Sequence, residues 1–110
     1  MNGQINDKKI YSLLGLCKKA GFIAAGEFST EKAVKSGVSR LVIVAKDASN
    51  NTKKNFRDMC EYYRVPYFEF GDKDGLGACL GFEYRASLSV SNEGLAKKIT
   101  DIMDSASDNA

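Results

Sequence analysis

The residues best placed to do chemistry follow Gly26, where a short apolar segment gives way to a polar, charged helix. Ser29 and Thr30 offer hydroxyl groups in the first turn, and Lys32 lies slightly further along. A helix start carries free N–H groups and the positive end of the helix dipole, so an anion can bind there. Glu27 is an ordinary partner of that dipole, however. The pattern therefore fits an anion-binding helix start or a well-formed surface helix.

Basic residues gather in the first 40 positions, although the net charge is only +2. Residues 1–40 contain seven Lys or Arg and three acids, whereas the rest of the chain contains nine Lys or Arg and eleven acids. This asymmetry favours one basic face that binds a polyanion, with random clustering on a solvated surface as the alternative. The residues expected to contact phosphates are Lys18, Lys19, Lys35 and Arg40.

Catalytic patterns are weak. The chain has no histidine, which removes the usual general base and the triad arrangements. Asp47 follows a buried strand, where α/β enzymes bind ligands, but we expect it to cap the loop between strand and helix. The segment 71–81, GDKDGLGACLG, lacks the lysine and hydroxyl of a phosphate-binding loop, so its glycines are expected to start and stop a short helix. We therefore expect no enzyme.

The cysteines Cys17, Cys60 and Cys79 are widely spaced, with no C-x-x-C pair and no histidine to join them. This spacing argues against a zinc site, and buried free thiols are the expected state. No metal or other cofactor is predicted.

The length of 110 residues fits one domain, and 44% hydrophobic with 27% charged residues is typical of a soluble globular chain. No apolar run reaches the roughly 20 residues that a membrane helix needs. The first ten residues contain no apolar core of a signal peptide, so we expect a cytoplasmic protein without a membrane partner.

Four sets of apolar residues at helical spacing each predict one helix with an apolar stripe, and a fifth helix is predicted over 27–36. The stripes are Ile10, Leu13, Leu14 and Cys17; Phe56, Met59, Cys60 and Tyr63; Leu76, Cys79 and Leu80; and Leu95, Ile99, Ile102 and Met103. Strands are predicted over 22–25, 41–45, 67–70 and 86–90. The second strand is expected to be covered on both faces, and the last, with alternating serines, on one face.

The helix ends carry their own signals. Asn6, Asn50 or Asn51, and Asn92 are the expected N-caps. Gly21, Gly37 and Gly81 are expected to follow the ends of helices, and Pro66 prevents the third helix from continuing. The resulting alternation of helix and strand predicts an α/β fold, with a sheet between two helix layers. We place this domain at residues 1–104 and a flexible C-terminal tail at 105–110.

The chain also resembles a known family. The segments LLGLCKKAGFIAAGE, KAVKSGVSRLVIVAKDAS, VPYFEF and LGACLG, over about residues 9–100, are similar to the kink-turn-binding ribosomal-protein superfamily. That family includes the archaeal k-turn protein of the large ribosomal subunit and box C/D particles. The chain is most similar to its small bacterial YlxQ-like branch. The resemblance implies a single-domain three-layer α-β-α sandwich with a four-stranded mixed sheet.

The resemblance also implies an RNA-binding surface made of two segments. In the family, the loop and helix after the first strand enter the opened major groove of a kink-turn, and the matching positions here are Gly26 and Lys32. A second loop packs against a flipped-out base. Its counterpart in this chain is Phe82, Glu83, Tyr84, Arg85 and Ala86.

The chain departs from the family pattern in both segments. Glu83, Tyr84 and Arg85 make the second loop more polar than that of the family. Phe28 and Ser29 stand where the family has asparagine and glutamate. Serine lacks the two acceptors of a carboxylate, and phenylalanine can only stack on an exposed base. Loss of one bidentate reader removes about 1–3 kcal/mol of discrimination, so we expect relaxed or altered kink-turn specificity.

Taken together, these patterns predict a non-enzymatic, ribosome-associated protein that binds structured RNA, acts in translation with ribosomal or translation-factor proteins, and is monomeric. The alternative is a protein-interaction or structural module on the same fold that no longer binds kink-turns.

Overall fold

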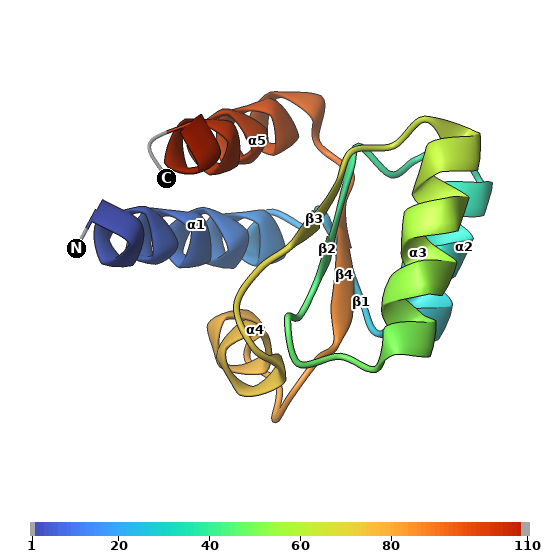
Figure 1. Ribbon diagram of the computed structural model, residues 1–110, viewed down its shortest axis with the longest axis horizontal. Helices are drawn as coiled ribbons and strands as arrows, with labels where there is room; N and C mark the ends of the chain where they lie inside the picture. The colour runs from blue at the N-terminus through green and yellow to red at the C-terminus, as the bar shows by residue number, and fades with distance from the viewer. Residues whose placement is uncertain (1, 109–110) are drawn as a thin grey trace.

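The computed structural model describes the backbone of residues 2–108 and the side chains of residues 6–105. Helices and strands alternate along the chain as predicted (Figure 1). The elements are α1 (Asn2–Lys19), β1 (Ile23–Ala25), α2 (Glu27–Lys35), β2 (Leu41–Val44), α3 (Asn50–Tyr63), β3 (Tyr67–Glu69), α4 (Lys73–Leu80), β4 (Ser87–Val90) and α5 (Glu93–Asp108).

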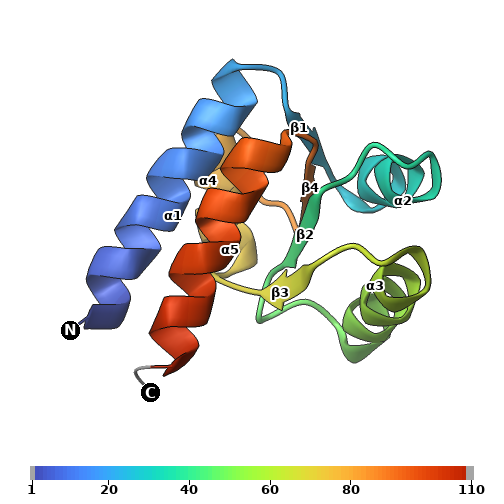
Figure 2. The ribbon, with the colours of Figure 1, turned by 90° about the horizontal axis from the view of Figure 1, so that it is seen from above.

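The four strands form one mixed sheet in the order β1-β4-β2-β3. β2 and β3 are parallel, whereas β4 runs antiparallel to both of its neighbours, β1 and β2. Helices α1, α4 and α5 cover one face of the sheet, and α2 and α3 cover the other (Figure 2). This confirms the predicted three-layer sandwich around a four-stranded mixed sheet.

The two central strands are buried on both faces. All four residues of β2 are buried, as the continuous apolar run over 41–45 predicts. The prediction that β4 is half-buried is wrong, because Ser87 and Ser89 are also buried. The Ser89 hydroxyl donates to Ser39 Oγ at 2.6 Å. Both serines therefore lie under a helix layer, where the Ser89 hydroxyl is hydrogen-bonded and the buried Ser87 hydroxyl has no hydrogen-bond partner among the described residues.

The helix ends correct two of the predicted caps. α1 begins at Asn2, so Asn6 lies inside the helix and is not its cap. α3 is capped by Ser49, whose Oγ accepts the N–H of Thr52 at 3.1 Å, and not by either of the two asparagines that follow it. The third prediction is confirmed, since Asn92 Oδ1 accepts from Leu95 at 2.8 Å.

The last helix, α5, runs through Asp108. The backbone of residues 105–108, the first part of the predicted tail, is therefore helical, and residues 109–110 lie outside the described residues. Among the helices that the structure describes, none is both long and apolar enough to cross a membrane.

Helix α4 holds the loop at 82–86 in place. Asp72 Oδ1 accepts the N–H of Gly75 at 2.6 Å and caps the helix, and Gly81 adopts φ 82° just after its end. The Arg85 N–H donates to the Lys73 carbonyl at 3.0 Å. At Gly77, an added Cβ would overlap the loop backbone and lie 2.7 Å from the Tyr84 nitrogen. The glycine at 77 is therefore required by the close approach of the loop.

We predict that Gly77→Ala lowers the free energy of unfolding by about 1–3 kcal/mol, because the new methyl group forces α4 and the loop apart. Gly94→Ala is the matched control, since its Cβ would meet only Asn92 Oδ1 at 3.5 Å in α5. The control should change stability by less than about 1 kcal/mol, in the stabilising direction. Urea unfolding of both variants measures the difference, and equal stabilities would contradict the packing at Gly77.

The free thiols are embedded in the fold. Cys17 and Cys60 are buried and Cys79 is half-buried, with its Sγ donating to the Leu76 carbonyl at 3.2 Å. Burial raises the pKa of Cys60 and of Cys79 to about 11, and it also raises the pKa of Cys17. Folding therefore favours the neutral thiols, which are poor nucleophiles at neutral pH.

We predict that these thiols weaken the fold at high pH. The unfolded chain ionises its thiols near pH 9.0, and the folded chain does so only near the raised pKa of about 11. Their contribution is fully present below pH 9 and is lost as the pH rises through that interval. From about pH 9 to about pH 11, the unfolding free energy of the variant Cys60→Ala/Cys79→Ala should therefore fall less steeply than that of the unaltered protein. An identical fall in both proteins would contradict the raised pKa values.

Candidate functional site

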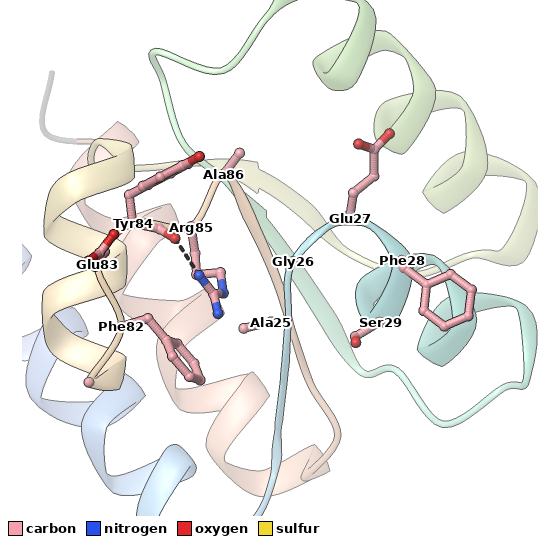
Figure 3. Close-up of a pocket in the computed structure, with 11 residues that line it drawn as sticks. Ala25, Gly26, Glu27, Phe28, Ser29, Phe82, Glu83, Tyr84, Arg85 and Ala86 are labelled. Carbon is pink, nitrogen blue, oxygen red and sulfur yellow. Dashed lines mark hydrogen bonds between the residues drawn. The ribbon is translucent and has the colours of Figure 1, made fainter.

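Two segments that are far apart in the sequence line one open groove of about 780 Å³. Residues 25–29 form one wall and residues 81–86 form the other (Figure 3). The sheet brings them together, because Ala25 pairs with Leu88 across β1 and β4, and the Gly26 N–H donates to the Ser87 carbonyl at 2.9 Å. The groove thus unites the two segments that the family resemblance assigns to RNA binding.

The first wall is the start of α2. Gly26 is its N-cap residue, with φ 97° and ψ 162°, a conformation that only glycine adopts readily. Glycine has no side chain to cap the helix, and no described side chain in residues 6–105 accepts a hydrogen bond from the amides of residues 27–29. The exposed Ser29 adds a hydroxyl in the same turn. This wall therefore presents hydrogen-bond donors to the groove.

The second wall holds two cations beside one aromatic ring. The Arg85 guanidinium carbon lies 4.0 Å from the centre of the Phe82 ring, and Lys18 Nζ, from the end of α1, lies 5.3 Å from it. Arg85 Nη1 also donates to the Tyr84 carbonyl at 2.7 Å. Both distances to the ring are within the range of cation–π attraction. Positive charge therefore gathers around the Phe82 ring, although Lys18 lies beside the groove lining and the same wall also contains the acidic residue Glu83.

The acidic and aromatic side chains of the first wall point elsewhere. In Figure 3 the Glu27 carboxylate is directed away from Arg85, and the Phe28 ring lies beyond Ser29 on the outer side of α2. The Phe28 side chain is 78% exposed. Ala25, Gly26 and Ala86, which also line the groove, add no charge. The groove accordingly suits a ligand that is rich in hydrogen-bond acceptors.

The structure corrects one predicted groove residue and places others outside the groove. Thr30 is fully buried, with its hydroxyl directed to the Ala24 carbonyl at 3.5 Å, so it does not offer a donor at the surface. Lys32 is exposed on α2 outside the groove lining, and Lys35, near the end of that helix, pairs with Glu31 at 3.8 Å. Of the predicted basic residues, Arg85 lines the groove, Lys18 lies beside it at the Phe82 ring, and Lys19 follows Lys18 at the exposed end of α1.

Arg40 lies at the other end of the sheet. It directly precedes β2, whose first residue pairs with Val90 at the end of β4, whereas the groove lies at the start of β4. Its Nη1 donates to the Gly37 carbonyl at 3.0 Å. A phosphate contact from Arg40 cannot therefore belong to the same groove.

Two groove residues, Ala25 and Gly81, were not predicted, although each directly precedes a predicted residue. Ala25 ends a predicted strand and Gly81 follows a predicted helix, so the signals that mark these ends in the sequence also mark the two residues. The approach of Lys18 to Phe82 had no such signal, because it depends on how α1 packs against α4.

Asp47 has a structural role, as expected, but a different partner. Its Oδ1 accepts the N–H of Lys73, the first residue of α4, at 2.9 Å. The carboxylate therefore joins the loop after β2 to α4, and does not cap the helix that follows it in sequence.

Comparison with known proteins identifies a family and several relatives of this chain. Residues 8–100 match the model of the ribosomal protein L7Ae/L30e/S12e/Gadd45 family. The chain is 35% identical over 94 residues to the RNA-binding protein YlxQ of Bacillus subtilis (strain 168), covering 86% of this chain and 94% of that protein. It is 33% identical over 99 residues to the RNA-binding protein YlxQ of Enterococcus faecium, covering 90% of this chain and 95% of that protein.

Two solved structures are similar as well. A protein of unknown function from Bacillus halodurans C has a TM-score of 0.85 and 35% identity, over 87% of this chain and 97% of that one. The Giardia lamblia 15.5kD RNA binding protein has a TM-score of 0.78 at 23% identity, over 91% of this chain and 86% of that one. It has the same fold as this chain.

Proposed function

Since the chain belongs to the ribosomal protein L7Ae/L30e/S12e/Gadd45 family, we propose that it binds structured RNA in the groove between residues 25–29 and 81–86, without catalysing a reaction. The two YlxQ relatives are named RNA-binding proteins, which supports this function. The observation that carries the proposal is the groove itself, where an uncapped helix start faces an aromatic ring with two cations.

The electrostatics of the groove suit a nucleic acid. Amide N–H groups and the dipole of α2 favour a negative charge at one wall. Lys18 and Arg85 supply positive charge at the other. Most contacts between proteins and nucleic acids go to the phosphate backbone, and they make affinity fall with salt. Lys19 and Lys32 are exposed beyond the groove, where they would contact phosphates of an RNA that extends past it.

The RNA specificity would differ from that of the kink-turn family. Phe28 and Ser29, in place of the family's asparagine and glutamate, leave no carboxylate reader at this position. The Phe28 ring is turned outward, so it would add stacking outside the groove and no hydrogen bond within it. We therefore propose relaxed preference for kink-turns, with ribosomal RNA as the target and translation in the cytoplasm as the setting.

A protein-interaction module is the second candidate, because the site has exposed aromatic side chains. Phe28 is 78% exposed and Tyr84 is 57% exposed. Aromatic anchors of this kind are frequent in protein interfaces. Such a module would bind its partner without Lys18 and Lys32, so removal of these two lysines distinguishes the two functions.

We predict that the protein binds a kink-turn duplex with, at most, a modest preference over a plain duplex, and that binding weakens steeply from about 50 to about 200 mM salt. Lys18→Ala/Lys32→Ala should lower the affinity for both RNAs. Each lost phosphate contact should also reduce the salt slope by about one. Fluorescence anisotropy titration at several salt concentrations measures both effects.

Lys54→Ala/Lys97→Ala is the matched control, since it removes the same charge from α3 and α5. Both control lysines form ion pairs within their own helices, with Asp58 at 2.7 Å and Asp101 at 3.6 Å. The control should retain nearly the affinity of the unaltered protein. If neither RNA binds at low salt, RNA binding is refuted, and an equal loss in both variants would refute the groove as its place.

A further inference from the structure

Another groove lies between α1 and α5, on the side of the sheet opposite to α2 and α3. The two helices lie side by side and run antiparallel (Figure 1, Figure 2). The groove has a volume of about 740 Å³, and none of its lining residues belongs to the groove between residues 25–29 and 81–86. It is therefore a separate place where a ligand can bind.

The apolar part of this lining comes from one side chain of each helix. Leu13 of α1 and Ile102 of α5 are half-buried, and both pack against the core while they line the groove. The exposed Ser12 is small, so it lets a partner approach α1 closely. A ligand that removes Leu13 and Ile102 from water gains free energy in proportion to the apolar area that it covers.

Three lysines surround these apolar side chains. Lys8, Lys9 and Lys98 line the groove, and all three are exposed. Because the helices are antiparallel, Lys98 near the start of α5 lies toward the opposite end of the groove from Lys8 and Lys9. Within residues 6–105, whose side chains are described, none of the three forms an ion pair. Their charge is therefore available to a ligand at both ends of the groove.

The nearby acidic residues do not cancel this charge. Asp101 is the one acid in the lining, and its Oδ2 lies 3.6 Å from Nζ of Lys97, one turn earlier in α5. Asp7 and Asp104 are exposed outside the lining. The groove consequently combines an apolar centre with positive ends, which is complementary to a ligand with an apolar centre and negative ends.

An acidic helix of a partner protein fits this combination better than a nucleic acid or a membrane does. No aromatic ring lines the groove, so an unpaired base finds no stacking partner, and phosphates alone would leave Leu13 and Ile102 uncovered. A lipid surface binds protruding apolar side chains, whereas these two are recessed between helices. An amphipathic helix places apolar anchors three or four residues apart and charges beside them.

We propose that the groove between α1 and α5 binds an acidic amphipathic helix of a partner protein. Leu13 and Ile102 contact the apolar anchors of that helix, and the three lysines pair with the carboxylates that flank them. The lining spans 8–13 and 98–102, about one and a half turns of each helix, so about two turns of the partner lie along it. The interaction is independent of the proposed RNA-binding function.

The test selects binders of the full chain from a display library of random peptides of about 16 residues, which are long enough to form a helix. Enriched peptides should carry a net negative charge and apolar residues at helical spacing. Lys8→Ala/Lys98→Ala should weaken the binding of these peptides about threefold to tenfold, because two ion pairs are lost. Fluorescence anisotropy with labelled peptides measures the change.

Lys46→Ala/Lys54→Ala is the matched control, since it removes the same charge from the loop after β2 and from α3. This control should bind the peptides as the unaltered protein does. Ile102→Ala removes an apolar contact and should also weaken binding, and urea unfolding establishes that each variant is folded. In the unaltered protein, the amide NMR shifts that change on peptide binding should lie in α1 and α5.

Three outcomes would overturn the proposal. The first is that the library yields no peptide enriched over a parallel selection on Lys8→Ala/Lys98→Ala. The second is that the enriched peptides shift amides outside α1 and α5. The third is that the same variant leaves peptide binding intact and instead weakens binding of duplex RNA or of phosphatidylserine vesicles, which would make the groove a phosphate-binding surface. Loss of RNA binding in Lys18→Ala/Lys32→Ala bears only on the other groove.

Discussion

The antiparallel pairing of β4 with both β1 and β2 determines where everything else in the molecule lies. Because β4 runs against β1, the start of one strand lies beside the end of the other. The loop that leads into β4 must therefore approach the turn that follows β1. The difference between the two buried faces of β4 fixes this register, since a slip by one residue would exchange Leu88 and Val90 with the two serines.

The helices then define the chemistry of the two approaching segments. Gly26 allows α2 to start at once after β1, in a backbone conformation that leaves the first amides without a capping side chain. Gly77 allows the loop at 82–86 to lie directly on α4, and the Lys73 carbonyl holds Arg85 there. Two glycines in different layers are thus responsible for the shape of one groove, although neither contributes a side chain to it.

The sequence predicts the elements well and their ends less well. Apolar stripes span several turns, so a single ambiguous residue does not change the assignment of a helix. A cap depends on one residue, and Ser49, Asn50 and Asn51 are all good candidates, of which the structure uses Ser49. The alternating serines of β4 predict a solvent-facing side because periodicity reports polarity and not size. Ser87 and Ser89 are small enough to lie beneath a helix.

The helix start of the first wall is predicted from its own residues as an anion-binding site, whereas the second wall is predicted only through the family resemblance. No local pattern relates 25–29 to 82–86, because their contact depends on strand order. The same limit explains Arg40, which belongs to a basic part of the sequence but lies at the opposite end of β2 from the groove. Thr30 is one residue beyond exposed Ser29, yet helical rotation turns it inward, where it is fully buried.

The walls of the groove belong to opposite layers of the sandwich, with α2 on one side of the sheet and α4 on the other. Any ligand that touches both walls crosslinks those layers noncovalently across the sheet edge. Its binding energy then adds to the work needed to separate them, because a ligand that binds only the folded state raises the melting temperature with its concentration. Occupancy of the groove and the stability of the whole fold are therefore thermodynamically coupled in this small domain.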